Sequence, residues 1–173
     1  LLAALILVGS APDTLAAPES PPLPCVHPEL RQLEFLRGTW KVTRTWLGPD
    51  QKLDPVLGES EFSSELGGCL VTERFRGTMK GDPFATLTLF AWDAGQKRLQ
   101  MVHSDSLHGS LLVFSGSGAE DGLAFDAQVR LSRTITLRQE YRRSGPTFVV
   151  ERKRGFEDSE AWRTVWKATY EKN

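Results

Sequence analysis

The chain has 173 residues, of which 40% are hydrophobic and 25% charged, as is typical of a globular domain with a substantial core. Its 21 basic and 22 acidic residues leave a formal net charge of −1. This balance excludes an overall field that would select nucleic acid or an anionic membrane surface. The two cysteines allow either one disulfide or two free thiols.

Residues 1–17 are interpreted as the remnant of a secretory signal peptide. An apolar run from Leu1 to Val8 precedes small residues, as an h-region precedes a cleavage zone. Cleavage after Ala17 and cleavage after Ser10 both stay open, and an uncleaved membrane anchor is the alternative. Because this run is shorter than the roughly 20 residues of a spanning helix, we expect a periplasmic or secreted protein without stable membrane insertion. Residues 18–27 form a Pro-rich linker.

A short helix is predicted over Pro28 to Leu36, directly before Gly38-Thr39-Trp40. Ten runs with a period of two and turn residues at their ends then predict strands. They are Trp40 to Leu47, Gly58 to Leu66, Cys69 to Arg76, Phe84 to Trp92, Arg98 to Ser104, Ser110 to Ser115, Leu123 to Arg130, Thr134 to Arg142, Thr147 to Arg154 and Trp162 to Tyr170.

Short strands at this spacing, with no helices between them, predict an antiparallel sandwich or barrel. We favour an up-and-down barrel because the connections have hairpin length and need no crossover. An even number of strands lets the last strand pair antiparallel with the first, which leaves no free edge. Residues 28–173 are therefore predicted to form one all-β, ten-stranded barrel domain, with the helix closing one end.

Alternation along the strands predicts which side chains face inward. The predicted interior is aromatic, with a few polar groups among the aromatic rings. A barrel of about this size can hold one small ligand, in which case arginines suit a carboxylate and indoles suit an apolar body. The alternative is a structural ion-pair cluster of Arg44, Glu73 and Arg152 in a filled core, since buried charges need partners. The candidate ligand-binding residues are Arg44, Trp46, Glu73, His103, Gln139, Arg152, Trp162 and Trp166.

Four segments carry a resemblance to a known family when they are taken in chain order. The segments Leu33-Glu34-Phe35-Leu36-Arg37-Gly38-Thr39-Trp40, Phe90-Ala91-Trp92-Asp93, Ser104-Asp105-Ser106 and Trp166-Lys167-Ala168-Thr169-Tyr170 resemble the bacterial domain-of-unknown-function family 1579. The resemblance implies a calycin-like barrel related to the lipocalins, and no activity. The nitrobindin branch of such barrels binds haem through a late histidine. This chain has no histidine after His108, so we expect no cofactor.

Catalytic and metal-binding motifs are weak. His103, Asp105 and His108 are spaced as H-x-D-x-x-H, which is not a recognised zinc signature, and zinc needs three or four converging ligands. Ser104 and Ser106 lie beside His103 and Asp105, but no nucleophile elbow accompanies them. We therefore assign no metal and no catalytic residue.

The sequence favours an exported, non-catalytic binding protein for a small, largely apolar molecule, with or without a carboxylate. The alternatives are a lyase-type or isomerase-type enzyme that uses His103 or Glu73 as acid or base, and a structural or interaction protein with a filled barrel. A disulfide between Cys25 and Cys69 is also predicted. Cys69 opens the third strand at the helix end of the barrel, Cys25 precedes the helix, and exported proteins meet an oxidising compartment.

Overall fold

The structure is a computed structural model that describes residues 25, 27–47, 55–119, 121–130, 132–156 and 159–173. The predicted signal-peptide remnant and most of the Pro-rich linker lie outside the described residues. Two short 3-10 helices accompany ten strands. The elements are η1 (Pro28–Leu36), β1 (Gly38–Trp46), β2 (Val56–Glu65), η2 (Leu66–Gly68), β3 (Leu70–Met79), β4 (Asp82–Asp93), β5 (Arg98–Asp105), β6 (Leu112–Ala119), β7 (Gly122–Arg130), β8 (Thr134–Ser144), β9 (Thr147–Phe156) and β10 (Ser159–Lys172).

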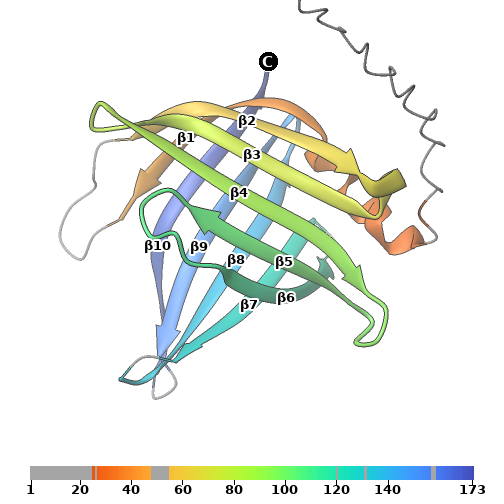
Figure 1. The fold of residues 1–173 in the computed structure, drawn as a ribbon. Helices are drawn as coiled ribbons and strands as arrows, with labels where there is room; N and C mark the ends of the chain where they lie inside the picture. Colours follow the sequence, from red (N-terminus) through yellow and green to blue (C-terminus); the bar gives the residue numbers. More distant parts are fainter. Residues whose placement is uncertain (1–24, 26, 48–54, 120, 131, 157–158) are drawn as a thin grey trace, which may run out of the picture.

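Each strand pairs antiparallel with the next along the chain, and β10 pairs with β1, so the sheet closes into a barrel (Figure 1). The β1–β10 ladder runs from Trp40 opposite Lys172 to Trp46 opposite Trp166. The predicted all-β, ten-stranded up-and-down barrel is therefore confirmed. Among the ten described strands, closure leaves no edge free to pair with another chain.

Helix η1 lies at one end of the barrel, which we call the base; the opposite end is the mouth. The buried residues of η1 are Leu30, Leu33 and Leu36. Their spacing of three matches the three residues per turn of a 3-10 helix, which explains why this segment is not an α-helix. The indole Nε1 of Trp40 donates a hydrogen bond of 2.6 Å to the carbonyl oxygen of Leu36. This bond joins the helix to the start of β1.

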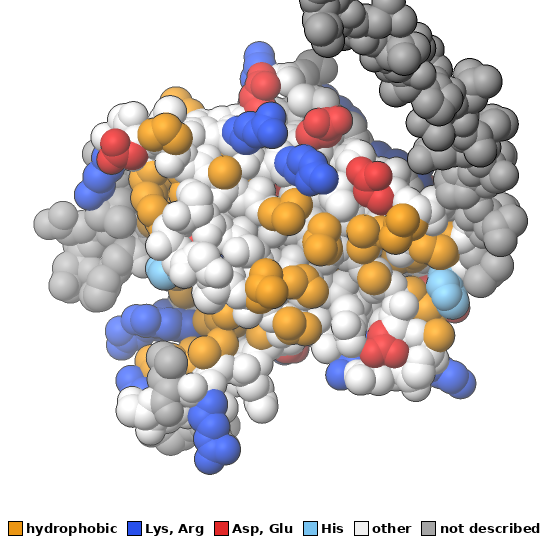
Figure 2. All heavy atoms as spheres, viewed as in Figure 1, with side chains coloured by type: hydrophobic (Ala, Val, Ile, Leu, Met, Phe, Trp, Pro, Cys, Tyr) orange, Lys and Arg blue, Asp and Glu red, His pale blue; other side chains and the backbone are white. Residues whose placement is uncertain are grey.

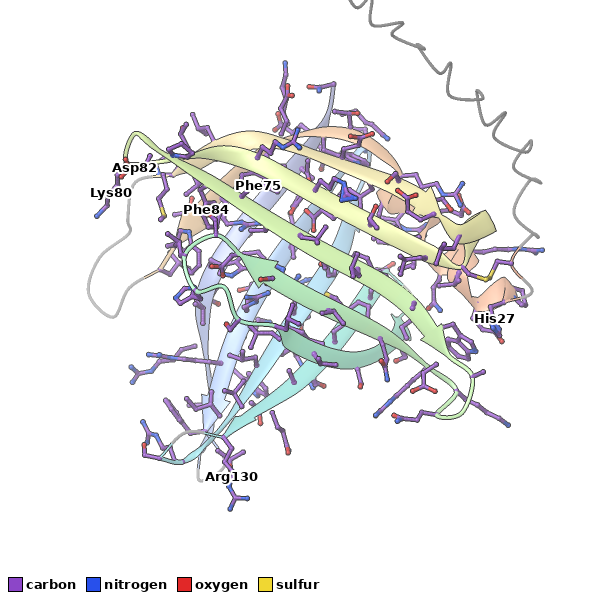
Figure 3. All side chains as sticks on the ribbon, viewed as in Figure 1. His27, Phe75, Lys80, Asp82, Phe84 and Arg130 are labelled. Carbon is purple, nitrogen blue, oxygen red and sulfur yellow. A yellow bond between two sulfur atoms is a disulfide. The ribbon has the colours of Figure 1, made fainter. Side chains whose placement is uncertain are left out.

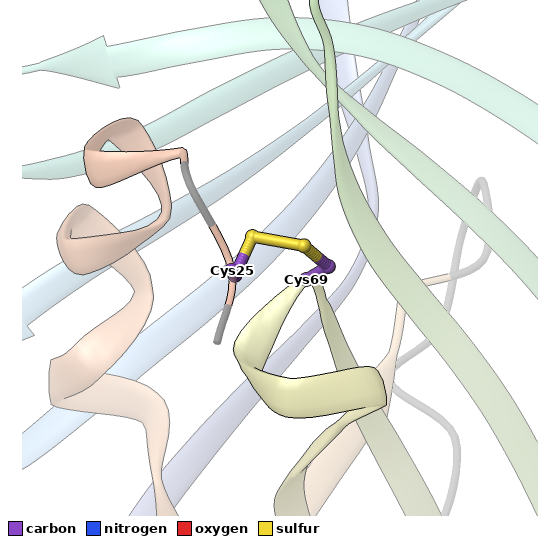
Figure 4. Close-up of a disulfide and its surroundings, with 2 residues drawn as sticks. All are labelled: Cys25 and Cys69. Atoms are coloured by element: carbon purple, nitrogen blue, oxygen red, sulfur yellow. A yellow bond between two sulfur atoms is a disulfide. The ribbon is translucent and has the colours of Figure 1, made fainter. Parts of the chain in front are cut away.

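A disulfide joins Cys25 to Cys69 at the base, as predicted (Figure 4). The backbone N–H of Cys25 also donates to the carbonyl oxygen of Gly67, at 2.9 Å. Together these bonds attach the segment that precedes η1 to the connection between β2 and β3.

The interior near the base is filled with aromatic rings. Neighbouring rings lie with centroids 4.3–6.4 Å apart, from the stacked pair of Phe148 and Tyr170 to the tilted pair of Phe62 and Phe90. Such distances are typical of close aromatic packing. We call this layer the aromatic floor; its members are Phe62, Phe90, Phe125, Tyr141, Phe148 and Tyr170.

Two inward assignments are wrong, and irregular pairing in β10 explains both. The register of β10 against β9 shifts between Ser159 and Arg163 and again between Thr164 and Trp166. A bulge inserts an extra residue and so changes which side chains share a face. Trp162 consequently lies outside the barrel, 42% exposed, with its ring packed over Gly155 and 5.0 Å from the guanidinium of Arg138.

The same alternation that places Trp162 inside also predicts an inward Thr164, but Thr164 shares this outer face. Its hydroxyl donates a 2.6 Å hydrogen bond to Glu151, which belongs to the surface charge network of β8 and β9. Beyond the bulge, Trp166 is buried as predicted.

Candidate functional site

Two buried arginines lie on either side of Trp166 in the mouth half of the barrel. The guanidinium carbon of Arg44 (β1) is 4.6 Å from the centroid of the Trp166 ring, and that of Arg152 (β9) is 5.0 Å away. Strand order causes this arrangement, because β10 lies between β1 and β9 and places Trp166 opposite Arg152. With His103, these residues form what we call the arginine cluster.

Arg44 is only 2% exposed and is held mainly by aromatic faces. Its guanidinium lies 4.9 Å from the ring centroid of Phe75 and 5.7 Å from that of Phe84. The Nε atom is buried without a hydrogen-bond partner, and Arg44 forms no ion pair within the described part of the chain. A buried charge normally has a paired countercharge, so Arg44 has unused capacity to bind an anion.

Arg152 is held by Gln139, whose Oε1 accepts hydrogen bonds from both Nε, at 2.8 Å, and Nη2. The amide nitrogen of Gln139 donates in turn to the hydroxyl of Tyr141, at 2.6 Å. Burial, together with the positive charge of Arg44, lowers the pKa of Arg152 to about 10. Arg152 therefore remains charged at neutral pH. Gln139 acts as its support, since both ends of the amide are occupied.

His103 lies on β5, where its Nδ1 is 3.0 Å from the hydroxyl oxygen of Thr88. Burial, followed by the charges of Arg152 and Arg44, lowers the pKa of His103 to about 2. The imidazole is therefore neutral at physiological pH. Its second nitrogen has no hydrogen-bond partner among the described residues, so it is available to a bound molecule.

Glu73 is buried near the arginine cluster, but its carboxylate is hydrogen-bonded to residues outside that cluster. Its Oε1 accepts hydrogen bonds from the hydroxyls of Ser60 and Tyr170, both at 2.8 Å. Burial, the negative charge of Glu73 and the hydrogen bond to it raise the pKa of Tyr170, whereas the positive charge of Arg44 and a side-chain hydrogen bond with Arg44 oppose this shift. The expected alternative of an ion-pair cluster is not formed: no ion pair joins Glu73 to Arg44 or Arg152 within 4.0 Å.

Two further buried polar atoms near the mouth lack partners. They are the indole Nε1 of Trp46 on β1 and the hydroxyl of Thr86 on β4. The ring of Trp46 lies 6.4 Å from that of Trp166, next to the arginine cluster. Figure 3 shows the neighbouring Phe75 and Phe84 far from His27, which precedes η1 at the base.

The structure thus brings together five of the eight candidate residues: Arg44, Trp46, His103, Arg152 and Trp166. Glu73 and Gln139 are buried beside them with internal partners, and Trp162 lies outside. Three inward residues were not predicted: Thr86 and Phe84 on β4, and Phe114 on β6, whose ring lies 5.4 Å from the guanidinium of Arg152. Alternation along β4 and β6 could have placed these residues inside.

Neither the metal motif nor the triad residue types converge. Asp105 Oδ1 contacts the Nδ1 of His108 at 2.9 Å and accepts the backbone N–H groups of Leu107 and His108. Burial acts to raise the pKa of Asp105, but these hydrogen bonds outweigh it and the pKa is lowered. Asp105 therefore organises the β5–β6 connection. No group of three metal-ligating side chains occurs among the residues that the structure describes.

The outer surface carries its own apolar area. Figure 2 shows hydrophobic side chains across the face made by the middle strands. Leu87, Leu111 and Val113 are 40%, 71% and 56% exposed. Leu87 and Leu111 help to line a hollow of about 580 Å³ between β3, β4 and β5. Most residues that line this hollow are on the outer face, but its lining also includes Phe75 and Thr86, which lie near the arginine cluster.

Comparison with known proteins supports the fold and leaves the activity open. The crystal structure of Rv2717c from M. tuberculosis is similar, with a TM-score of 0.58 and 15% identity, over 86% of this chain and 99% of that chain. No curated protein matches the chain in sequence. The family described as "Protein of unknown function (DUF1579)" matches residues 26–172. The chain therefore belongs to the DUF1579 family.

Proposed function

We propose that this protein binds a small, largely apolar molecule that bears a carboxylate, in the mouth half of its barrel, without converting it chemically. The observation that carries the proposal is Arg44, a buried guanidinium with a free Nε and no carboxylate partner among the described residues. Such a group is costly to bury, and a bound anion would compensate the cost.

The buried charges favour an anion over a neutral ligand. Among the described residues, the buried charged side chains are Arg44, Glu73 and Arg152. Two arginines against one carboxyl group leave one positive charge uncompensated, because His103 is neutral. A single carboxylate would balance the interior, and the forked geometry of a guanidinium suits it.

An apolar lining favours a largely apolar body on the same ligand. Phe75, Phe84 and Trp166 surround Arg44 with aromatic faces, and Trp46 lies beside Trp166. Ligand sites commonly combine such a lining with a few placed polar groups. Thr86, with its unpartnered hydroxyl, supplies one more polar group.

Binding without catalysis is the better-supported alternative because neither proposed acid or base is suited to that role. An effective general acid or base has a pKa near the operating pH, whereas that of His103 is lowered to about 2. Glu73 already holds Ser60 and Tyr170 through one oxygen. We therefore assign Glu73 a structural role and His103 the role of a neutral hydrogen-bonding group, and neither acts as an acid or base in our proposal.

We further propose that the protein works outside the reducing cytosol. The Cys25–Cys69 disulfide supports this location, since disulfides persist in oxidising compartments. Within the described ranges, no helix is both long and apolar enough to cross a membrane.

Titration with medium-chain fatty acids and aromatic acids, followed by tryptophan fluorescence, tests the binding proposal. We expect saturable quenching, which the double variant Arg44→Leu/Arg152→Leu should weaken strongly while its circular dichroism stays that of a folded barrel. Arg138→Leu is the matched control, because it removes an arginine paired with Asp126 on the outer surface. Unchanged fluorescence across the whole panel of acids and neutral ligands would refute the proposal.

A further inference from the structure

We propose that the ligand enters the barrel with its carboxylate first, so that the charged head lies deepest and the apolar end points to the mouth. The inference rests on the proposed function and adds the orientation and the class of acid. The acids that fit are those with an unhindered carboxylate and a variable far end. Three layers of the interior, taken from base to mouth, support this orientation.

The first layer blocks the base. Tyr170 lies opposite Val42, one inward position closer to the base than Arg44. Tyr141 lies opposite Val150, one inward position closer to the base than Arg152. Both tyrosines are buried, belong to the aromatic floor and are hydrogen-bonded, to Glu73 and Gln139 respectively. A close-packed layer of this kind leaves no path for a tail below the arginines.

The second layer contains the charges. Arg44 and Arg152 lie directly above the floor, with Trp166 between them. The electrostatic attraction between opposite charges grows as water is excluded, so a carboxylate gains most at this depth. An apolar tail placed here would instead leave both guanidiniums desolvated and without a countercharge.

The third layer, nearest the mouth, is apolar. Trp46 is the next inward residue after Arg44 on β1, and Phe84 lies near the mouth end of β4. Met79 and Leu112 are partly buried and pack against the core there. An apolar body extending upward from the arginine cluster would meet these side chains and could reach solvent at its far end.

Two isomeric acids test the orientation without altering the protein. In 6-phenylhexanoate the ring is at the far end, and in 2-phenylhexanoate it stands beside the carboxylate. We expect the 6-phenyl isomer to bind at least about tenfold more tightly in calorimetric titration. The methyl ester of 6-phenylhexanoate, which lacks the charge, should lose about tenfold or more as well.

A second experiment locates the two ends of the ligand. Bromine quenches a tryptophan that it touches, so 8-bromooctanoate should quench Trp46 and 2-bromooctanoate should quench Trp166. The variant Trp46→Phe should lose most of the quenching by 8-bromooctanoate and keep that by 2-bromooctanoate. Trp162→Phe is the matched control, since this residue lies outside the barrel, and it should change neither signal.

The outcomes separate the two proposals. Equal or tighter binding of 2-phenylhexanoate, or loss of the 2-bromooctanoate signal in Trp46→Phe, overturns the orientation and leaves acid binding intact. Tight binding of the methyl ester overturns the carboxylate-first inference and, with it, the requirement for a carboxylate in the proposed function. If no acid binds at all, the proposed function itself fails.

Discussion

The guanidinium of Arg44 lies over the indole ring of Trp166, at 4.6 Å from its centroid, in place of a carboxylate partner. Cation–π contacts of this kind contribute about 0.5–2 kcal/mol each and are well below the cost of desolvating a charge. Arg44 is therefore a buried cation whose charge is compensated only in part by the described residues of the chain. This relationship favours the proposed binding site over a structural ion-pair cluster.

Replacing Arg44 by methionine should weaken the binding of acids without a large loss of stability. We expect the free energy of unfolding to fall by no more than about 1 kcal/mol or to rise, because apolar replacement of a buried charge is often neutral or stabilising. Binding of acids should weaken at least about tenfold. Urea denaturation and calorimetry measure the two effects, with Arg138→Met as the outer-surface control. A loss of stability above about 3 kcal/mol would instead indicate a structural role.

Removal of the Tyr170 hydroxyl should act mainly on stability, because Glu73 loses a hydrogen bond while Arg44 keeps its contacts with aromatic rings. Tyr170→Phe leaves the buried Glu73 with one of its two hydrogen bonds, and a hydrogen bond to a charged group contributes about 1.5–3 kcal/mol. We expect a loss of this size in urea denaturation, with unchanged affinity for acids. A large loss of affinity in this variant would show that Glu73 and Tyr170 belong to the ligand site.

The disulfide at the base should stabilise the fold without affecting the mouth. Cys25 and Cys69 are separated by 44 residues, for which the chain-entropy treatment gives about 4 kcal/mol. Cys69→Ser should lower the free energy of unfolding by about this amount and leave acid binding unchanged. Two reactive thiols in freshly isolated, denatured protein would show that the disulfide does not form.

Local patterns in the sequence predicted most of the fold. Alternation and turn residues identified all ten strands, and the positions of Cys25 and Cys69 at the same end predicted their disulfide. The 3-10 form of η1 was missed, although the spacing of its three buried leucines indicates it.

The candidate site was predicted less completely because its details depend on long-range packing. A bulge between Thr164 and Trp166 has no clear signal in the residues themselves, yet it places Trp162 outside. Alternation indicates that Glu73 and Gln139 face inward. It does not indicate which side chains they form hydrogen bonds with. Those partners come from strands far away in the sequence, such as Tyr170 for Glu73.

Trp40 should be structural, in contrast to Trp162. Trp40 is 3% exposed, bonded to Leu36 and packed edge-on against Phe148 at 4.7 Å. Trp40→Ala should cost about 3–5 kcal/mol, the range for truncation of a large buried aromatic residue. Trp162→Ala is the control on the outer face and should cost far less. Equal losses in urea denaturation would contradict the described register of β1 and β10.

His103 should make the fold less stable as the pH falls. Its pKa is about 2 in the folded protein, against an ordinary value of 6.5. Below about pH 6.5 the unfolded chain therefore binds a proton that the folded protein does not, and stability declines until the pH approaches about 2. The decline amounts to about 1.4 kcal/mol for each pH unit.

His103→Gln isolates this contribution, because it keeps a polar side chain and removes the titrating group. Carboxylates such as Asp105, whose pKa is lowered, lose stability on acidification in both proteins, so only the difference between the two proteins reports His103. Between about pH 6 and pH 4, the wild type should lose about 1.4 kcal/mol more per pH unit than the variant in urea denaturation. Parallel curves would show that His103 takes up a proton in the folded barrel as readily as in the unfolded chain. That result would contradict the neutral His103 on which the charge balance of the arginine cluster rests.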